Sequence, residues 1–170
     1  DNADNWQLGV HRRMHSLTGT VNAAGSTVRK TFGDGAEVVY AYDAVLQRYV
    51  STEGDGAHDT LQWSSGSSQW TWTDGSARAT EVYDSSGRLL VSRDTDGNTT
   101  TYAYTGSLLT QITDSSNQVT FLDYTGSNLT QIRTVISGVT QTRTRYGYDG
   151  SNRLTSVTFD LTPADNAIAD

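Results

Sequence analysis

The sequence predicts an all-β protein in which repetitive antiparallel β-hairpins form a curved, twisted β-ribbon. Three observations support this fold class. A tyrosine recurs at nearly regular steps, apolar and polar side chains alternate before it, and turn-forming residues follow it. Glycine, serine, threonine, asparagine and aspartate are abundant and there is one proline, a composition typical of short strands joined by many turns.

The repeat is clearest at Tyr83, Tyr104, Tyr124 and Tyr148, which are separated by 21, 20 and 24 residues. We call these residues, together with Tyr42, the repeat anchors. Tyr42 keeps the same phase further upstream. Trp63 and Val21 also fall on this phase, which extends the array to seven repeats, the first three degenerate.

Each repeat has the pattern of two short strands and two turns. In residues 142–148, Thr142, Thr144, Tyr146 and Tyr148 alternate with arginine and glycine, as in a half-buried strand. The segments 84–87 (Asp-Ser-Ser-Gly) and 149–152 (Asp-Gly-Ser-Asn) supply the positive φ angles and side-chain hydrogen bonds of tight turns. One hairpin cannot bury its own apolar face, so consecutive hairpins must lie side by side.

The domain boundaries follow from this phase. We expect an irregular segment over 1–20, the array over 21–160 and a linker or short helical tail over 161–170. Thr162 and Pro163 resemble a helix start. An array cut from a longer chain would expose two unpaired edges, so we also predict either edge-strand self-association or edges protected by irregular terminal segments.

Charge and composition exclude several functions. The net charge of -7 disfavours nucleic acid as a partner, and no apolar run is long enough for membrane insertion. The absence of cysteine excludes disulfides and thiolate chemistry. The chain does not start with methionine, and we expect it to be part of a longer parent chain.

The strings Tyr-Asp-Ser-Ser-Gly-Arg-Leu-Leu from Tyr83 and Tyr-Gly-Tyr-Asp-Gly-Ser-Asn-Arg-Leu from Tyr146 resemble the YD repeat of bacterial Rhs proteins. The resemblance is strongest over 79–160. The same repeat occurs in toxin-complex shell proteins and teneurins. The resemblance implies a secreted or cell-surface bacterial protein whose repeats form a shell that encloses a toxin, of which this chain would be a partial wall. It also implies carbohydrate or cell-surface receptor binding.

The sequence is therefore compatible with three functions. The first is a non-enzymatic structural scaffold, and the alternative is a carbohydrate- or cell-surface-binding module. A hydrolase ranks last, because no catalytic residue set and no Gly-X-Ser-X-Gly motif is present.

The ligand-binding candidates are Trp63, Trp70, Trp72 and Asp74. Alternation places Trp70 and Trp72 on one face, where indole rings could stack on sugars beside the Asp74 carboxylate. The competing interpretation, which we favour, is that these tryptophans replace tyrosines in the packed core.

No cofactor or metal is predicted. Asp94 and Asp96 resemble the start of a calcium loop, but position 12 from Asp94 is Thr105, where an EF-hand needs glutamate. His11 and His15 have a spacing that zinc sites can use, but no third ligand stands nearby.

Overall fold

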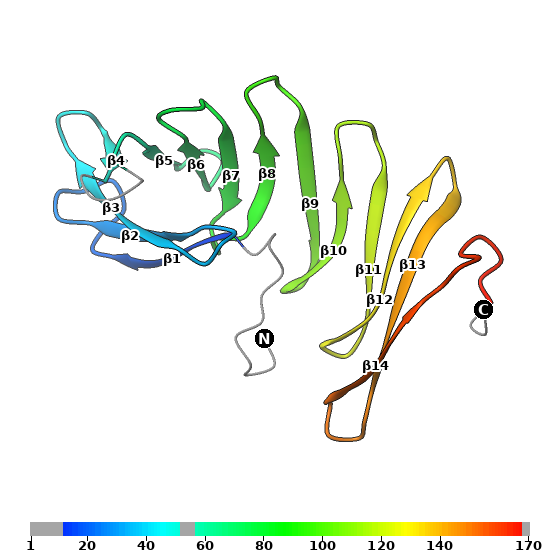
Figure 1. Ribbon diagram of the computed structural model, residues 1–170. Coiled ribbons are helices and arrows are strands. Elements are labelled where there is room, and N and C mark those ends of the chain that lie inside the picture. The colour runs from blue at the N-terminus through cyan, green and yellow to red at the C-terminus, as the bar shows by residue number, and fades with distance from the viewer. Residues whose placement is uncertain (1–11, 52–56, 168–170) are drawn as a thin grey trace. The chain divides into compact units, whose positions relative to one another are not determined.

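The computed structural model describes residues 12–51 and 57–167 of the chain (Figure 1). Among these residues, fourteen strands follow one another in sequence order in one sheet. No described residue is helical. The all-β, hairpin-repeat fold class predicted from the sequence is confirmed. None of the described segments forms a helix of the length and apolarity needed to cross a bilayer.

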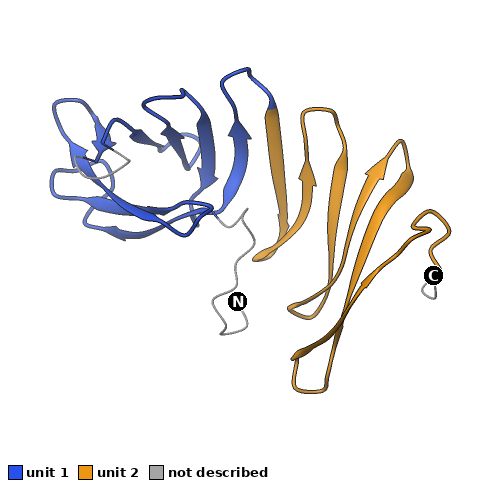
Figure 2. Ribbon diagram, in the orientation of Figure 1, with its two compact units in different colours: residues 1–98 blue, residues 99–170 orange. Residues whose placement is uncertain are grey.

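The chain divides into two compact units, residues 1–98 and 99–170 (Figure 2). The first unit contains eight strands: β1 (Arg13–Thr18), β2 (Thr27–Thr31), β3 (Glu37–Asp43), β4 (Arg48–Val50), β5 (Thr60–Ser64), β6 (Gln69–Thr73), β7 (Thr80–Asp84) and β8 (Leu89–Arg93). The second unit contains six: β9 (Thr99–Thr105), β10 (Leu108–Thr113), β11 (Val119–Thr125), β12 (Asn128–Ile136), β13 (Val139–Tyr148) and β14 (Leu154–Phe159).

The first unit closes on itself. The Met14 N–H donates to the carbonyl of Gly87 at 2.9 Å, and Arg13 forms an antiparallel bridge with Arg88. Strand β1 therefore meets the turn before β8, and the strands of this unit form a ring (Figure 1). The free edge expected at this end of the array is thus partly occupied.

Gly87 makes this closure sterically feasible. Its φ is +78°, and a Cβ at this position would collide with the Met14 backbone. The ring encloses most of the core. Its buried apolar side chains are Met14, Val28, Tyr40, Tyr49, Leu61, Trp70, Trp72, Tyr83 and Leu89.

The N-terminal end of the array differs from the sequence-based boundary. Strand β1 lies inside the segment 1–20 that was expected to be irregular, and Val21 lies in the turn that follows it. Three residues with positive φ, Gly19, Asn22 and Gly25, shape this turn, so the phase of the repeat is kept in sequence but not in strand position. At the other end, the described residues 161–167 form bends and turns rather than a helix.

One turn motif recurs through both units. Asp84, Asp94, Asp114 and Asp149 each accept hydrogen bonds on Oδ1 from the backbone N–H groups two and four residues later. The third residue after each aspartate has a positive φ and is either glycine or asparagine. The predicted role of Asp-Ser-Ser-Gly and its relatives as turns is confirmed.

Candidate functional site

The predicted tryptophan site lies within an aromatic row on β3 to β6. Tyr42 contacts Tyr49, with ring centroids 5.2 Å apart. Trp70 then contacts both Tyr49 and Trp63, at 5.2 and 5.0 Å. These edge-to-face and tilted contacts are favourable for aromatic pairs.

Burial leaves little of this row for a ligand. Trp70 and Trp72 are 4% and 5% exposed, and Trp63 is half-buried. Cross-strand pairing sets Trp63 opposite Trp70 and Trp70 opposite Tyr83, so the repeat positions meet across neighbouring strands. This arrangement supports the core interpretation of Trp70 and Trp72.

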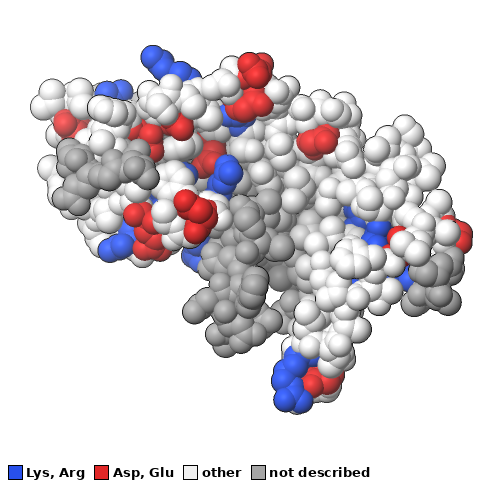
Figure 3. All heavy atoms as spheres, viewed as in Figure 1, with Lys and Arg blue, Asp and Glu red and all other residues white. Residues whose placement is uncertain are grey.

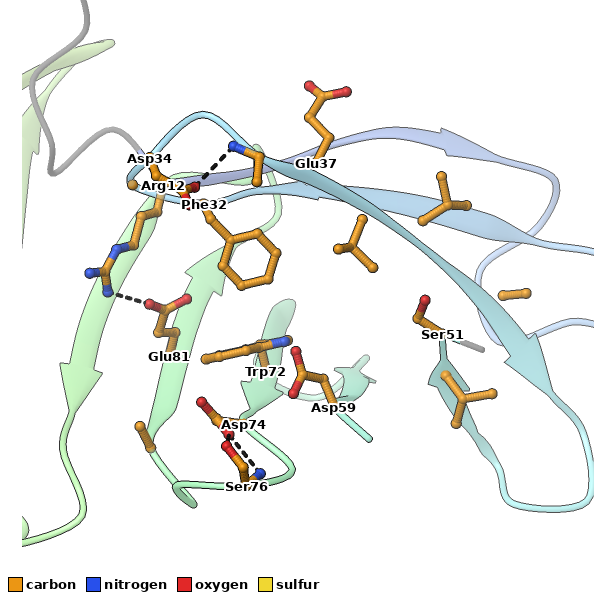
Figure 4. Close-up of a pocket in the computed structure, with 17 residues that line it drawn as sticks. Arg12, Phe32, Asp34, Glu37, Ser51, Asp59, Trp72, Asp74, Ser76 and Glu81 are labelled. Carbon is orange, nitrogen blue, oxygen red and sulfur yellow. Dashed lines mark hydrogen bonds and ion pairs between the residues drawn. The ribbon is translucent and has the colours of Figure 1, made fainter. Parts of the chain in front are cut away.

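A charged cluster lies beside the row, inside the ring. Lys30 Nζ lies 3.0 Å from Glu81 Oε2, and the side chains are 0% and 5% exposed. The Arg12 guanidinium donates to Glu81 Oε1 at 2.5 Å (Figure 4). The Tyr83 hydroxyl donates to Glu81 Oε2. The Glu81 carboxylate on β7 thus contacts Lys30 of β2, Tyr83 of its own strand and Arg12 just before β1.

Aromatic rings complete the environment of Lys30. Its Nζ lies 3.4 Å from the centroid of Phe32 and 3.9 Å from that of Trp72. The attraction of the Glu81 carboxylate opposes the loss of hydration of this ammonium group. Burial therefore outweighs the attraction of Glu81 and lowers the pKa of Lys30 from 10.5 to about 8.

A second set of hydrogen-bonded side chains, Trp72, Tyr40 and Asp59, lies in the same unit. Trp72 Nε1 donates to the Tyr40 hydroxyl at 2.9 Å, and that hydroxyl donates to Asp59 Oδ2 at 3.1 Å. Asp59 Oδ1 accepts the N–H of Gly75 at 2.9 Å. Burial raises the pKa of Tyr40 above its ordinary value, as it does for Tyr83.

A cavity of about 1160 Å³ opens between these groups and strand β3. Figure 4 shows Phe32, Trp72, Asp59, Asp74 and Glu81 around it. Lys30 does not line this cavity, and Glu81 is already paired with Arg12 and Lys30. The cavity therefore offers hydrogen-bond acceptors and an aromatic edge, rather than a reactive amine.

Asp74, the fourth predicted ligand residue, lies at the rim of this cavity. Its Oδ1 accepts hydrogen bonds from the N–H groups of Ser76 and Ala77, and these lower its pKa. Much of its hydrogen-bonding capacity therefore serves the turn. The structure brings Trp72 and Asp74 to one cavity, whereas Trp63 and Trp70 do not line it.

The remaining metal candidates lie apart. The Asp94 carboxylate accepts hydrogen bonds from Asp96 and Asn98, and those from Asn98 lower the pKa of Asp94. His15 contacts Ser16, Thr31 and Glu37, and His11 lies outside the described residues. Over the described ranges, no three histidine or acidic side chains gather as a metal site would require. Figure 3 shows acidic and basic side chains interspersed over the first unit.

The repeat anchors share a geometry that the sequence alone could not give. Four anchors are each paired with a leucine on the other strand of their hairpin: Tyr83, Tyr104, Tyr124 and Tyr148. In each hairpin the register shifts directly beside this pair. The Tyr124 hydroxyl donates to the carbonyl of Leu109 at 2.9 Å. The Tyr148 hydroxyl donates to that of Leu129 at 2.8 Å. Both acceptors are the leucines paired with the preceding anchor, so each bond links one repeat to the one before.

Comparison with known families agrees with this geometry. The family model described as RHS Repeat matches residues 83–119, which contain the Tyr83 and Tyr104 anchors. The chain carries an RHS repeat. The resemblance stated from the sequence is confirmed. No curated protein matches the chain.

Further anchors in phase lie on either side of the matched RHS repeat. Downstream, Tyr124 and Tyr148 keep the hydroxyl bonds to the previous hairpin. Upstream, Tyr42 opposite Tyr49 and Trp63 opposite Trp70 keep the cross-hairpin position but replace the leucine by an aromatic ring. The degenerate repeats at Tyr42 and Trp63 therefore keep the cross-hairpin pairing but use an aromatic partner instead of leucine.

Sequence reasoning missed the Lys30–Glu81 cluster. Lys30 is the only lysine of the chain, and it stands in a strand beside two more buried residues, Val28 and Thr31. A lone lysine in an apolar alternation was the available signal. Its partner Glu81 is 51 residues away in sequence, and only closure of the ring brings the two together.

Proposed function

We propose that the chain is a non-enzymatic structural segment of a secreted or cell-surface bacterial Rhs/YD-repeat protein, in which it forms part of a toxin-enclosing wall. The observation that carries this proposal is the hydroxyl bond from each of Tyr124 and Tyr148 to the preceding hairpin. A bond made in the same way by two successive repeats allows an array to be extended without a new interface at every step.

The distribution of polar groups favours a structural role over a catalytic one. The buried Glu81 is shared by Arg12, Lys30 and Tyr83, and the buried Asp59 is shared by Tyr40 and Gly75. Groups that neutralise and orient one another inside a ring stabilise that ring. A catalytic base would instead need access to the proton of a substrate.

Protease protection in the parent protein tests the wall. The polypeptide that follows the array in the parent chain should resist protease until the array itself is unfolded. As a control, the same polypeptide expressed alone should be cleaved quickly. Equal cleavage rates in the two settings would contradict enclosure.

The alternative, a carbohydrate-binding module, is favoured by the cavity that holds Trp72, Asp59 and Asp74. Acidic acceptors beside an aromatic ring suit the hydroxyl groups and apolar face of a sugar. Titration of the chain with soluble glycans, followed by tryptophan fluorescence, tests this alternative. A saturable change would support it, and a flat response up to millimolar glycan would exclude it.

A further inference from the structure

The chain changes direction after β14, at Asp160. Asp94 and Asp114 hold the same place after β8 and β10, and each donates its N–H to the carbonyl four residues later, just before the next strand. Asp160 instead donates its N–H back to the carbonyl of Arg143 on β13, at 3.0 Å. The turn that leads from one hairpin into the next is therefore not closed at this point.

A proline accounts for this difference. The third residue after the two earlier aspartates is Gly97 in one turn and Asn117 in the other, with φ angles of +89° and +61°. The third residue after Asp160 is Pro163, whose ring holds φ at a negative value. The same aspartate turn cannot form there, so the sequence directs the chain out of the sheet.

Two arginines of β13 hold the segment that follows. Arg145 donates to the carbonyl of Ala167 at 2.9 Å and to that of Asn166 at 3.4 Å. Arg143 donates to the carbonyl of Pro163 at 3.2 Å and to the side-chain oxygen of Asn166. Each guanidinium group thus bonds to two positions of the segment, which fixes both its beginning and its end.

The Asp160 carboxylate completes this arrangement. Its Oδ2 lies 3.7 Å from Arg143 Nε and 3.8 Å from Arg145 Nη2, and the Asp160 side chain is 3% exposed. The Arg143 side chain is 6% exposed, whereas all residues of the neighbouring strand β14 are exposed. Arginine is rarely buried without partners, and here the segment supplies both the cover and the partners.

The position of Arg143 is unfavourable without this segment. Arg143 stands directly opposite Arg133 on β12, and like charges in such a pair destabilise a sheet. Arg133 is turned to the Asp123 carboxylate, at 3.1 Å, and lies over the Phe121 ring. Arg143 finds its acceptors in residues 160–167 instead, so the two arginines are stabilised from different sides.

We propose that Arg143 and Arg145 form an exit clamp, which ends the run of hairpins at β14 and docks residues 160–167 on one face of the second unit. The site fits a polypeptide that brings one carboxylate and several carbonyl oxygens. In the parent chain, the polypeptide after residue 167 would then continue from this face rather than as a further hairpin paired with β14. This inference goes beyond the proposed function, and it holds whether or not the array encloses another polypeptide.

Amide hydrogen exchange of the full chain tests the exit clamp. The amides of residues 161–167 should exchange more slowly than those of a free peptide of the same sequence. Arg143→Gln combined with Arg145→Gln should speed their exchange by on the order of 10-fold or more, because it removes the bonds that hold the segment. Arg153→Gln is the matched control: Arg153 pairs with Asp149 in the turn before β14, its side chain is 79% exposed, and its loss should leave residues 161–167 unchanged.

A single substitution guards against loss of the fold. Arg145→Gln keeps the buried pair of Arg143 with Asp160 and removes only the bonds to the carbonyls of Asn166 and Ala167. Exchange should then become faster at the end of the segment but not at its beginning. Strands β10–β13 should exchange slowly in every variant, which shows that the second unit remains folded.

The same comparison in the parent chain separates docking from a further hairpin. The exit clamp predicts that the two arginine substitutions release residues 161–167 there as well. Protection that survives both substitutions in the parent chain would mean that strand pairing holds the segment, and it would overturn the proposal. Equal exchange of residues 161–167 in the wild type and the double variant of the chain itself would overturn it too.

Discussion

At the residue scale, Lys30 shows how a charge is retained inside a small core. Its ammonium group contacts Glu81 and two aromatic rings, and the Lys30 side chain is fully buried. Attraction to one carboxylate does not fully offset the loss of hydration, so the pKa of Lys30 falls to about 8. The ring is therefore held together by a cluster that itself costs free energy at neutral pH.

This cost predicts a pH dependence of stability. Between about 8, the pKa of Lys30 in the folded chain, and 10.5, its ordinary value, the unfolded chain binds more protons. The free energy of unfolding should therefore rise with pH in this window, by up to about 3 kcal/mol. Above pH 10 it should fall again, because the folded state raises the pKa values of Tyr40 and Tyr83.

Urea unfolding of the wild type and of Lys30→Met at pH 7 to 11 measures this effect. The variant should lack the rise but keep the fall above pH 10. The other charged groups beside Lys30, namely Glu81, Arg12 and Asp59, remain in the variant and serve as its internal reference. Parallel pH profiles for the two proteins would show that Lys30 is not the titrating group.

At the element scale, the hairpins are joined by anchors and turns that act at different ranges. The aspartate turns are local, since each aspartate bonds to residues two and four positions later. The hydroxyls of the Tyr124 and Tyr148 anchors act between hairpins, reaching carbonyls 15 and 19 residues earlier. Local turns set the shape of each hairpin, and the anchors set how hairpins are spaced.

Removal of one anchor hydroxyl should weaken the second unit. Tyr124→Phe leaves the Leu109 carbonyl without this donor, and we expect a loss of about 1 kcal/mol in the free energy of unfolding. Tyr146→Phe is the control, because the Tyr146 hydroxyl makes no hydrogen bond with any described residue and its ring is also half-buried. Equal losses in chemical denaturation would contradict the role of the anchor hydroxyl.

Closure of the first unit rests on Gly87, and a pair of glycines isolates its effect. Gly87→Ala and Gly97→Ala carry a similar penalty for positive φ, at +78° and +89° in the same kind of turn. Only at Gly87 would the new methyl group meet backbone, that of Met14, whereas at Gly97 it meets the flexible side chain of Arg93. We expect Gly87→Ala to lower the melting temperature clearly more than Gly97→Ala, and equal melting temperatures would argue against closure.

At the scale of the whole molecule, the sequence predicted the array better than its ends. Period-2 alternation and the aspartate turns are local signals, so strands and hairpins followed from them. The pairing of Met14 with Gly87 and of Lys30 with Glu81 depends on how far the first unit curves, which no local pattern encodes. For the same reason the sequence predicted an unpaired edge at β1, which Gly87 and Arg88 partly occupy.

The candidate site was predictable only in part. Trp70 and Trp72 were expected on one strand face, and both lie there. Their burial follows from the facing strands, which supply Tyr49 to Trp70 and Phe32 to Trp72. The cavity, with Asp59 and Glu81, could not be foreseen because its residues come from separated strands.

The hairpins of both units belong to one array with a common repeat phase. Amide hydrogen exchange tests this most directly. We expect slow exchange for the paired strands of both units, β2–β7 and β10–β13, with fast exchange at the turns that recur between them. Slow exchange confined to residues 12–98, with fast exchange throughout β10–β13, would contradict it.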